Sequence, residues 1–502
     1  MKDSGECTTT YTPSIHRWWG ENSKLLVSVF LIGIFSYGFA VFNFNFGIDE
    51  DSAFGWGAKN FITGHATINR WAMFAYYYAL LPGVFYPFIG NILALFFISL
   101  AYCLFISNHQ SLTFSQKLLF CGIAISLPTF GAMFEFSFMV AQVSCSAALV
   151  VVAYLFTING NTLVTKWVLP IILCTFATFT YQSLLYIFPG LFFIDCLLGK
   201  FDIAKKSSFR IFCRIIFLCG ISLLCYVSIS QLLHLITGIP QSQYGESVAV
   251  YLHNSFVKAF KILCKELKSK FDSTLLSPFW FLPIPIALIL LCAKPRLRYA
   301  FSLCLVIGYF FFPYLGLGLA LPIRSWFFAP FIYAALFLAA CLQAPHKFRI
   351  LFFIFSIWIV CFNSSINARS SLLDNFSEKR DQLIASRIYN ELCVEAPQSL
   401  KNAKRSLIII GKFKLEGILP NISNGDREIY GASFFSWNSE PQRIYHYLKI
   451  FGVKLPPSIN GSPRAEKITS LAMVRDMPAY PARGFIRMVD DVLVIKLADE
   501  AK

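Results

Sequence analysis

The run LLVSVFLIGIFSYGFAVFNF, Leu25–Phe44, decides the fold of this chain. A helix crosses the hydrocarbon core of a bilayer with about 20 mostly apolar residues, and this run has that length. Lys24 precedes the run and no cleavage site of small residues follows it, so the pattern predicts a retained first span and not a signal peptide.

The composition of the 502-residue chain extends this prediction to most of its length. Hydrophobic residues make up 56% of the chain and charged residues 14%, whereas about a quarter of the residues of a soluble domain are charged. A secreted disulfide scaffold, a disordered chain and a simple cytosolic enzyme are therefore excluded. The net charge of +16 falls in short runs between apolar stretches, which is typical of cytoplasmic loops and not of a nucleic-acid-binding face. We expect a polytopic α-helical membrane protein with no nucleic-acid partner.

Further apolar stretches bring the predicted number of spans to about eleven. They begin near Gly90, Lys117, Phe138, Trp167, Ser183, Ile211, Leu275, Tyr299, Trp326 and Phe348. Because Lys and Arg concentrate in short cytoplasmic loops, the richest basic loop, 200–210, is expected inside. Alternation from a cytoplasmic N-terminus, residues 1–24, then places the loops 46–72 and 237–274 and the C-terminal region outside. Lysines at positions 258, 261, 265, 268 and 270 fall in this outer loop, where their spacing predicts an amphipathic helix lying on anionic headgroups.

The composition changes after residue 366, where the membrane module that begins at residue 25 is expected to end. Apolar runs shorten to strand length at Ser406–Gly411 and Val492–Ile495, and helical stretches are predicted around Gln382–Cys393 and Gln442–Phe451. We therefore expect residues 367–502 to form a small α/β domain outside the cytoplasm, which would be the periplasm in the family named below.

Three consecutive acidic residues, Asp49, Glu50 and Asp51, follow the first span by a few residues. Neighbouring carboxylates repel one another, and such crowding can turn one of them into a general base while the next stays ionised. A divalent cation, Mg or Mn, on Asp49 and Asp51 is an alternative way to relieve the repulsion, and a solvated turn is another.

The 15 cysteines lie mostly within apolar runs, and no Cys/His cluster with zinc-like spacing occurs.

Other polar residues fall on the same predicted outer side as the acidic loop: Arg70, Trp71, Tyr181, Gln182 and Arg324. Arginine is suited to bidentate capture of phosphate, and an arginine near lipid is costly unless it is paired or used. Interfacial anchoring of the arginines and hydrogen bonding of Tyr181 and Gln182 between helices are the structural alternatives. Carboxylates and arginines that meet at the outer leaflet would suit chemistry on a lipid-linked phosphate.

These features resemble a known family. A first span followed by an outer-loop Asp-Glu pair is similar to the GT-C superfamily of membrane glycosyltransferases that use polyprenyl-phosphate sugars. Within it, the chain resembles the phage-type serotype-converting O-antigen glucosyltransferases, the Glucosyltransferase-II domain family. The matching stretches are Ile48–Asp51, Trp56, Gly64 with Arg70-Trp71, Tyr181-Gln182, Met477–Gly484 and Val492–Leu497. One departure is that residues 65–69 separate Gly64 from Arg70, which leaves open whether Arg70 occupies the arginine position of the family.

The resemblance implies a function and its partners. The expected donor is undecaprenyl-phosphate glucose and the expected acceptor is lipid-linked O-antigen. Transfer would be direct and inverting, at the periplasmic face of the bacterial inner membrane. A donor-synthesising glucosyltransferase and a flippase are expected as functional links.

The resemblance also implies roles for the candidate residues. Asp49 or Glu50 would be the base, and Arg70 and Arg324 would bind phosphate. The remaining candidate substrate-binding residues are Asp51, Trp71, Tyr181, Gln182 and Lys496. Lys496 stands alone in an apolar strand, where it could point into a site or lie on the surface of an edge strand.

Two other classes of protein stay open. An O-antigen polymerase or another lipid-linked glycan enzyme would share the spans and the arginines, but its large outer loop would lie between spans. A transporter or flippase would carry ionisable residues at mid-membrane and often shows internal repeats.

Overall fold

The computed structural model describes residues 15–44, 46–47, 50, 63–79, 87–202, 204–242, 249–271, 297–395, 405–413, 431–436 and 441–499. The chain divides into two compact units. The helical unit comprises Met1–Phe42 and Ile62–Ala368, and the sheet unit comprises Asn43–Phe61 and Arg369–Lys502. The division at Ala368 lies two residues from the predicted end of the membrane module.

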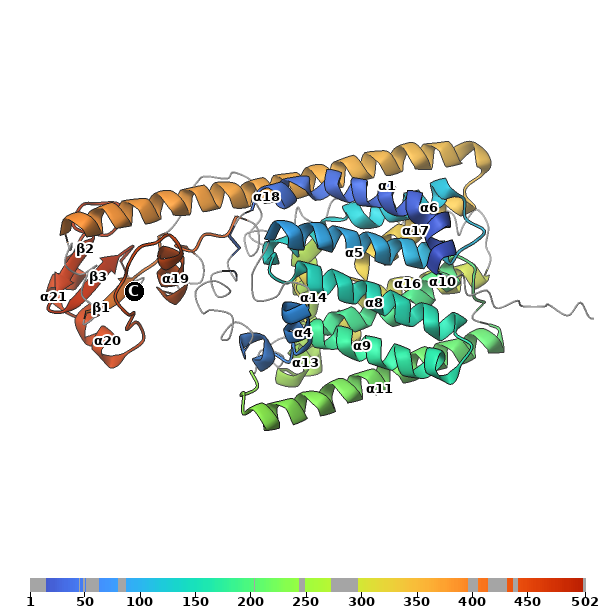
Figure 1. The fold of residues 1–502 in the computed structure, drawn as a ribbon, viewed down its shortest axis with the longest axis horizontal. Helices are drawn as coiled ribbons and strands as arrows, with labels where there is room; N and C mark the ends of the chain where they lie inside the picture. Colours follow the sequence, from blue (N-terminus) through green and yellow to red (C-terminus); the bar gives the residue numbers. More distant parts are fainter. Residues whose placement is uncertain are drawn as a thin grey trace, which may run out of the picture. The chain divides into compact units, whose positions relative to one another are not determined.

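Long apolar helices dominate the helical unit (Figure 1). Five helices of the described residues are long and apolar enough to cross a membrane. They are α1 (Ile15–Phe42), α5 (Pro87–Ser107), α8 (Val140–Asn159), α11 (Lys206–Thr237) and α18 (His346–Glu395). A sixth span is formed if α6 (Phe114–Ser126) and the segment Pro128–Phe136 cross the membrane together. That segment contains α7 (Pro128–Gly131) and η1 (Phe134–Phe136), and it is bent relative to α6. The bend of 45° follows from Pro128, which cannot continue the hydrogen bonding of α6.

Shorter apolar helices complete the bundle. They are α9 (Leu169–Thr180) with η2 (Val164–Val168), α10 (Ile187–Leu197) with η3 (Gln182–Tyr186), α16 (Leu297–Phe311) with η5 (Phe312–Gly316), and α17 (Ala329–Gln343). Every predicted span falls on an apolar helix except the one near Leu275, which lies outside the described residues. The count of eleven spans and their orientation stay predictions.

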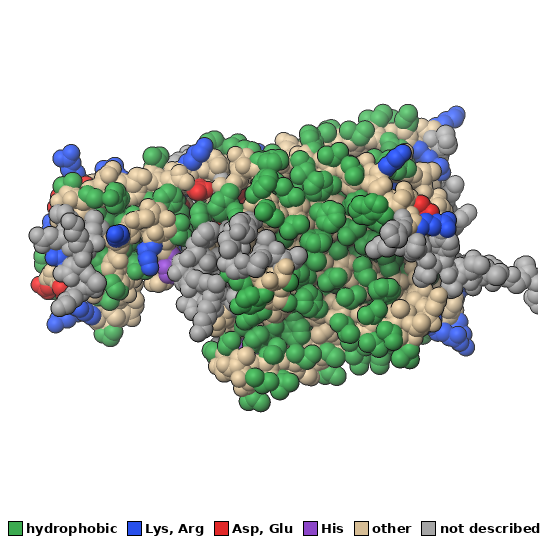
Figure 2. All heavy atoms as spheres, viewed as in Figure 1, with side chains coloured by type: hydrophobic (Ala, Val, Ile, Leu, Met, Phe, Trp, Pro, Cys, Tyr) green, Lys and Arg blue, Asp and Glu red, His purple; other side chains and the backbone are tan. Residues whose placement is uncertain are grey.

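The helices of this unit pack against one another as a bundle. Helix α5 contacts α8 and α1, α8 contacts α9, and α9 contacts α11. Large apolar side chains nevertheless point away from the bundle, among them Phe35 on α1, which is 65% exposed, and Leu224 on α11, which is 61% exposed. Figure 2 shows hydrophobic side chains over most of the visible face of this unit. Such a surface is expected where lipid replaces water, so the chain has the character of a helical membrane protein.

The sheet unit has α/β architecture. The described residues of this unit form three strands, β1 (Ser406–Ile410), β2 (Ile486–Val489) and β3 (Val492–Lys496), in the order β1-β3-β2. Strand β3 pairs parallel with β1 and antiparallel with β2. The other elements are the second part of α18, α19 (Pro441–Ile450), α20 (Pro463–Thr469) and α21 (Ala472–Arg475).

Alternating side chains of the strands build two cores, one on each face of the sheet. Leu407 and Leu493 pack with residues of α18 and α19. Ile408 and Val494 pack with Ala465 and other residues in and around α20 and α21. The predicted strands and helices of this region are therefore present, and β2 is an additional strand.

Helix α18 also binds irregular segments of the sheet unit through its side chains. The Asp381 carboxylate accepts hydrogen bonds from Ser433 Oγ at 2.5 Å and from the Phe434 amide at 2.8 Å. Burial raises the pKa of Asp381 to about 7 although these two hydrogen bonds act to lower it. The Glu378 carboxylate accepts the Phe46 amide at 3.2 Å, so the start of the acidic loop is attached to α18.

Candidate active site

A short turn before α4 (Ala72–Ala79) sets the position of Arg70. The Thr67 hydroxyl donates to the Gly64 carbonyl at 2.7 Å, and the Arg70 amide donates to the His65 carbonyl at 3.0 Å. Asn69 ends the turn with a φ of 63°, a left-handed conformation that Asn tolerates better than most residues. The turn is therefore specified locally, and it directs the Arg70 side chain into the helical unit.

Arg70 and Arg324 both interact with Tyr181, which follows the last residue of α9. The guanidinium carbon of Arg70 lies 4.3 Å from the centroid of the Tyr181 ring. The Tyr181 hydroxyl lies 3.0 Å from Ser325 Oγ, in η6 (Ile323–Ser325), and Arg324 of the same short helix also interacts with this hydroxyl. Three of the sequence-predicted site residues therefore come together, although they lie far apart in the chain.

The Arg70 guanidinium keeps unused hydrogen-bond donors. Its Nη1 contacts Met139 Sδ at 3.9 Å, and its Nε is buried with no hydrogen-bond partner. Within the described parts of the chain no carboxylate pairs with Arg70. Burial, with help from Arg70, lowers the pKa of His65 to about 3, so the neighbouring imidazole is neutral. A cation held against an aromatic ring with free N–H groups is suited to bind an anionic group.

Trp71 and Gln182 anchor this turn to neighbouring elements. The Gln182 amide donates to the Ile68 carbonyl at 3.0 Å and to the Tyr226 hydroxyl at 2.9 Å. Trp71 Nε1 donates to Ser230 Oγ of α11 at 3.3 Å. Both side chains hydrogen-bond between segments, which for Gln182 is the structural alternative, and a direct contact with substrate stays a prediction for each.

Asn69 makes a further link between the turn and α11. Its side-chain oxygen accepts a hydrogen bond from Ser230 Oγ at 2.5 Å and lies 2.7 Å from His234 Nε2. The turn that carries Arg70 is therefore held both by Gln182, which binds Ile68, and by α11, which binds Asn69.

Of the three consecutive acidic residues, Glu50 is the one that the structure describes. Its carboxylate is fully buried and accepts the Gly47 amide at 3.0 Å, and the Glu50 amide donates to the Gly47 carbonyl at 3.0 Å. Asp49, Asp51 and Trp56 lie outside the described residues. Glu50 belongs to the sheet unit and the arginines belong to the helical unit, so the predicted meeting of acids and arginines stays a prediction.

Lys496 is the last residue of β3, the central strand of the sheet and not an edge strand. Its ammonium donates to the carbonyls of Arg475 at 2.6 Å and Met477 at 2.8 Å, and it lies 2.7 Å from a carboxylate oxygen of Asp499. These three acceptors give Lys496 a structural role within the sheet unit, and a role in substrate binding stays a prediction.

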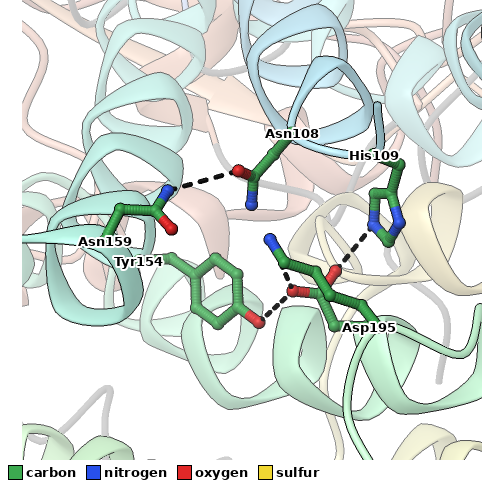
Figure 3. A network of polar contacts seen from close by, with 6 residues as sticks. Asn108, His109, Tyr154, Asn159 and Asp195 are labelled. Atoms are coloured by element: carbon green, nitrogen blue, oxygen red, sulfur yellow. Dashed lines mark hydrogen bonds and ion pairs between the residues drawn. The ribbon is translucent and has the colours of Figure 1, made fainter. Parts of the chain in front are cut away.

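A second polar network occupies the other end of the helical unit (Figure 3). Asp195 of α10 is fully buried, and its carboxylate accepts a hydrogen bond from the Tyr154 hydroxyl at 2.7 Å. His109 Nε2 lies 2.8 Å from the same carboxylate, and Lys200 Nζ lies 3.7 Å from it. Sequence reasoning missed this network, although an acidic residue within the apolar stretch 187–198 was a signal for it.

Helix α8 separates the two polar regions. Met139, directly before α8, contacts Arg70, and Asn159, its last residue, donates to Asn108 Oδ1 at 3.2 Å. The 20 residues of α8 span about 30 Å, which is the thickness of the hydrocarbon core of a bilayer. One end of the unit thus presents a cationic, largely aromatic site, and a length of α8 of about 22 Å separates it from Tyr154 in the second network.

No metal site appears in the described part of the chain, where no group of three or more His, Cys, Asp or Glu side chains converges. The cation considered for Asp49 and Asp51 lies outside that part and stays a prediction.

The fold and the site define a helical membrane protein with a cationic site suited to an anionic group at one end of its bundle. The chain belongs to the family described as Glucosyl transferase GtrII, whose model matches residues 38–342. The match covers more than half of the chain and contains Glu50, Arg70, Tyr181 and Arg324. The predicted family is thereby confirmed, and the chain is a member of a glucosyltransferase family. No curated protein and no solved structure matches it.

Proposed function

We propose that the protein transfers glucose from undecaprenyl-phosphate glucose to a hydroxyl of lipid-linked O-antigen at the periplasmic face of the inner membrane. Membership of the glucosyltransferase family supports the sugar, and a cationic site at one end of an apolar bundle supports a lipid-linked phosphate as its carrier. The observation that carries the proposal is the convergence of Arg70 and Arg324 on Tyr181, with Arg70 Nε buried and without a partner.

The proposed reaction is a single displacement. The acceptor hydroxyl attacks the anomeric carbon, and Asp49 or Glu50 takes its proton. The bond between that carbon and the phosphate oxygen breaks, and its electron pair stays on the departing undecaprenyl phosphate. Negative charge therefore develops on the leaving oxygen, where a fixed cation stabilises the transition state more than the ground state. Arg70 and Arg324 would supply that charge, and attack from the opposite face would invert the anomeric configuration.

The remaining predicted residues have supporting roles in this proposal. Tyr181 orients the guanidinium of Arg70 by stacking, and Trp71 and Gln182 hold the turn that carries it. A divalent cation on Asp49 and Asp51 would be bound by carboxylate oxygens, which Mg and Mn prefer, and no step above depends on it. An enzyme that makes the donor and a flippase that delivers it are required partners of the pathway.

Transfer of label from radiolabelled undecaprenyl-phosphate glucose to lipid-linked O-antigen by the purified protein tests the proposal. We expect Arg70→Gln and Arg324→Gln each to lower kcat by about 100-fold or more, as the removal of a preorganised charge-stabilising group does. Asp49→Asn is compared with Glu50→Gln, and the variant that abolishes transfer identifies the base. Chelation followed by addition of Mg or Mn tests the metal.

Arg214 provides a matched control for the arginine variants. Its guanidinium lies 5.4 Å from the centroid of the Trp167 ring, so it also rests on an aromatic ring, but it donates to the Thr157 carbonyl near the end of α8 remote from Arg70. Arg214→Gln should retain transfer. Equal losses in the Arg214 and Arg70 variants would contradict a role in phosphate binding, and absence of transfer from any polyprenyl-phosphate sugar would favour the polymerase or transporter alternatives.

A further inference from the structure

Helix α14 (Phe256–Phe271) carries two different exposed strips. Four exposed lysines, at positions 258, 261, 265 and 268, lie within an arc of about 80° when successive residues are placed 100° apart. The adjoining arc exposes Phe256, Val257 and Phe260, which are 69%, 65% and 41% exposed. Large exposed apolar side chains beside a cationic strip are typical of helices that lie at a membrane surface.

The opposite side of α14 is attached to the protein. Ala259 and Leu263 on this side are fully buried. Glu266, the one acidic residue of the helix, also lies away from the lysine arc, so the cationic strip contains no carboxylate to neutralise it. Helix α14 is therefore held by one side, with an apolar strip next to the attached side and the lysines beyond it.

The segment that precedes α14 fixes the helix at the end of the bundle where Arg324 lies. The Val250 amide, at the start of α13 (Val250–His253), donates to the Gly318 carbonyl at 2.9 Å, and the Tyr251 hydroxyl donates to the Leu315 carbonyl at 2.8 Å. Residues 315 and 318 lie in and just after η5, a few positions before Arg324.

The same stretch is bound to the residues that precede α17. The Tyr314 hydroxyl donates to the Leu321 carbonyl, and Trp326 Nε1 donates to that hydroxyl at 3.2 Å. Helix α14 and Arg324 are thus parts of one connected assembly, at the end of the helical unit where headgroups would surround the bundle.

We propose that α14 is an interfacial helix that binds the phosphate groups of anionic phospholipids. Phe256, Val257 and Phe260 insert among the acyl chains near the headgroups, and the lysines reach the phosphates. Burial of an apolar strip and attraction of lysines to anionic lipid are the two contributions that hold such helices on membranes. The proposal also explains why lysines gather in a loop predicted to be outside, where Lys and Arg are ordinarily scarce.

Hydrogen exchange of the intact protein in nanodiscs tests this proposal without any measurement of transfer. Nanodiscs of phosphatidylcholine are compared with nanodiscs that also contain phosphatidylglycerol. We expect exchange of the amides of 256–271 to slow at least about tenfold when the anionic lipid is present, and the effect to shrink in high salt. A variant with glutamine at positions 258, 261, 265 and 268 should lose the slowing.

A matched control removes the same amount of charge from the sheet unit. It replaces four exposed basic residues by glutamine: Lys412, Lys454, Lys467 and Arg483. This control should exchange like the wild type. Equal exchange of wild type in the two lipids, or a lysine variant that still responds, would overturn the proposal.

A further experiment tests whether the phosphate that α14 binds comes from phospholipid or from the glucose donor. Phosphatidylcholine nanodiscs receive one or two molecules of undecaprenyl-phosphate glucose for each protein. Slowing caused by this donor and not by phosphatidylglycerol would also overturn the proposal, because the lysines would then recognise the substrate. Failure of the transfer assay leaves these outcomes unchanged, since exchange reports lipid contact alone.

Discussion

The hydrogen bond from Tyr154 to Asp195 gives a quantitative test of the polar network remote from the arginine site. Both side chains are fully buried, and the hydroxyl lies 2.7 Å from the carboxylate oxygen. Hydrogen bonds to charged groups contribute about 1.5–3 kcal/mol in soluble proteins, whereas polar contacts between membrane helices average about 0.6 kcal/mol. Because His109 and Lys200 remain to satisfy Asp195, we expect Tyr154→Phe to lower the free energy of unfolding by about 1.5–2 kcal/mol.

The measurement is equilibrium unfolding in mixed micelles, followed by tryptophan fluorescence. Tyr102 supplies the control, since it is fully buried and its hydroxyl has no hydrogen-bond partner in the described part of the chain. Tyr102→Phe should leave stability unchanged or raise it slightly. In an Asp195→Asn background the cost of Tyr154→Phe should fall below about 1 kcal/mol, because the acceptor is then uncharged. The assignment of this stabilisation to the hydrogen bond would be refuted if Tyr154→Phe and Tyr102→Phe lowered the free energy of unfolding equally. It would also be refuted if Tyr154→Phe had the same effect on the free energy of unfolding in the wild type and in Asp195→Asn.

Three further predictions concern other contacts. The pKa of Asp381, about 7 in the folded state, lies above the unfolded value of 3.8, so the folded state keeps the carboxyl proton at higher pH than the unfolded state does. The free energy of unfolding should therefore fall as pH rises from about 4 to 7. Hydrogen exchange of the amides of 431–436, corrected for intrinsic rates, should show this pH dependence in the wild type and not in Asp381→Asn. Gly318 has a φ of 67°, and a Cβ at this position would collide with the Tyr251 ring. Gly318→Ala should therefore displace α13 from the residues after η5, and proteolysis within 250–271 should become faster. Lys496→Met removes the donor from the buried Met477 carbonyl and the partly buried Arg475 carbonyl. We expect it to destabilise the sheet unit by about 1–3 kcal/mol, measured as loss of exchange protection in β1 and β3.

The helices could be predicted from sequence because each requires only a long apolar run. This criterion located α1, α5, α8 and α11 without knowledge of their neighbours. It could not locate the bend at Pro128, because a proline in an apolar stretch is compatible with a kinked span or with two helices. Strand β2 escaped prediction because its four residues include the exposed Arg487, and a run so short carries little periodicity.

The two polar regions show the limit of sequence reasoning about the site. Arg70, Tyr181 and Arg324 could be grouped because each falls at the same predicted side of the membrane. Their mutual contacts depend on the packing of three distant segments and required the structure. Lys200 lies five residues after Asp195, but Tyr154 and His109 come from two other segments, and no local pattern connects them with Asp195.

The fixed length of α8 makes bilayer thickness a variable that should control this protein. The helix is bounded by Arg70 at one end and by Asn108 at the other, so neither polar region can shift along the membrane normal without the other. In lipids with longer acyl chains the bilayer must thin around the protein or cover one of these regions, at a cost of fractions of a kcal/mol for each ångström of mismatch. Transfer should therefore peak at one acyl-chain length, and on both sides of that optimum it should fall although no residue has changed.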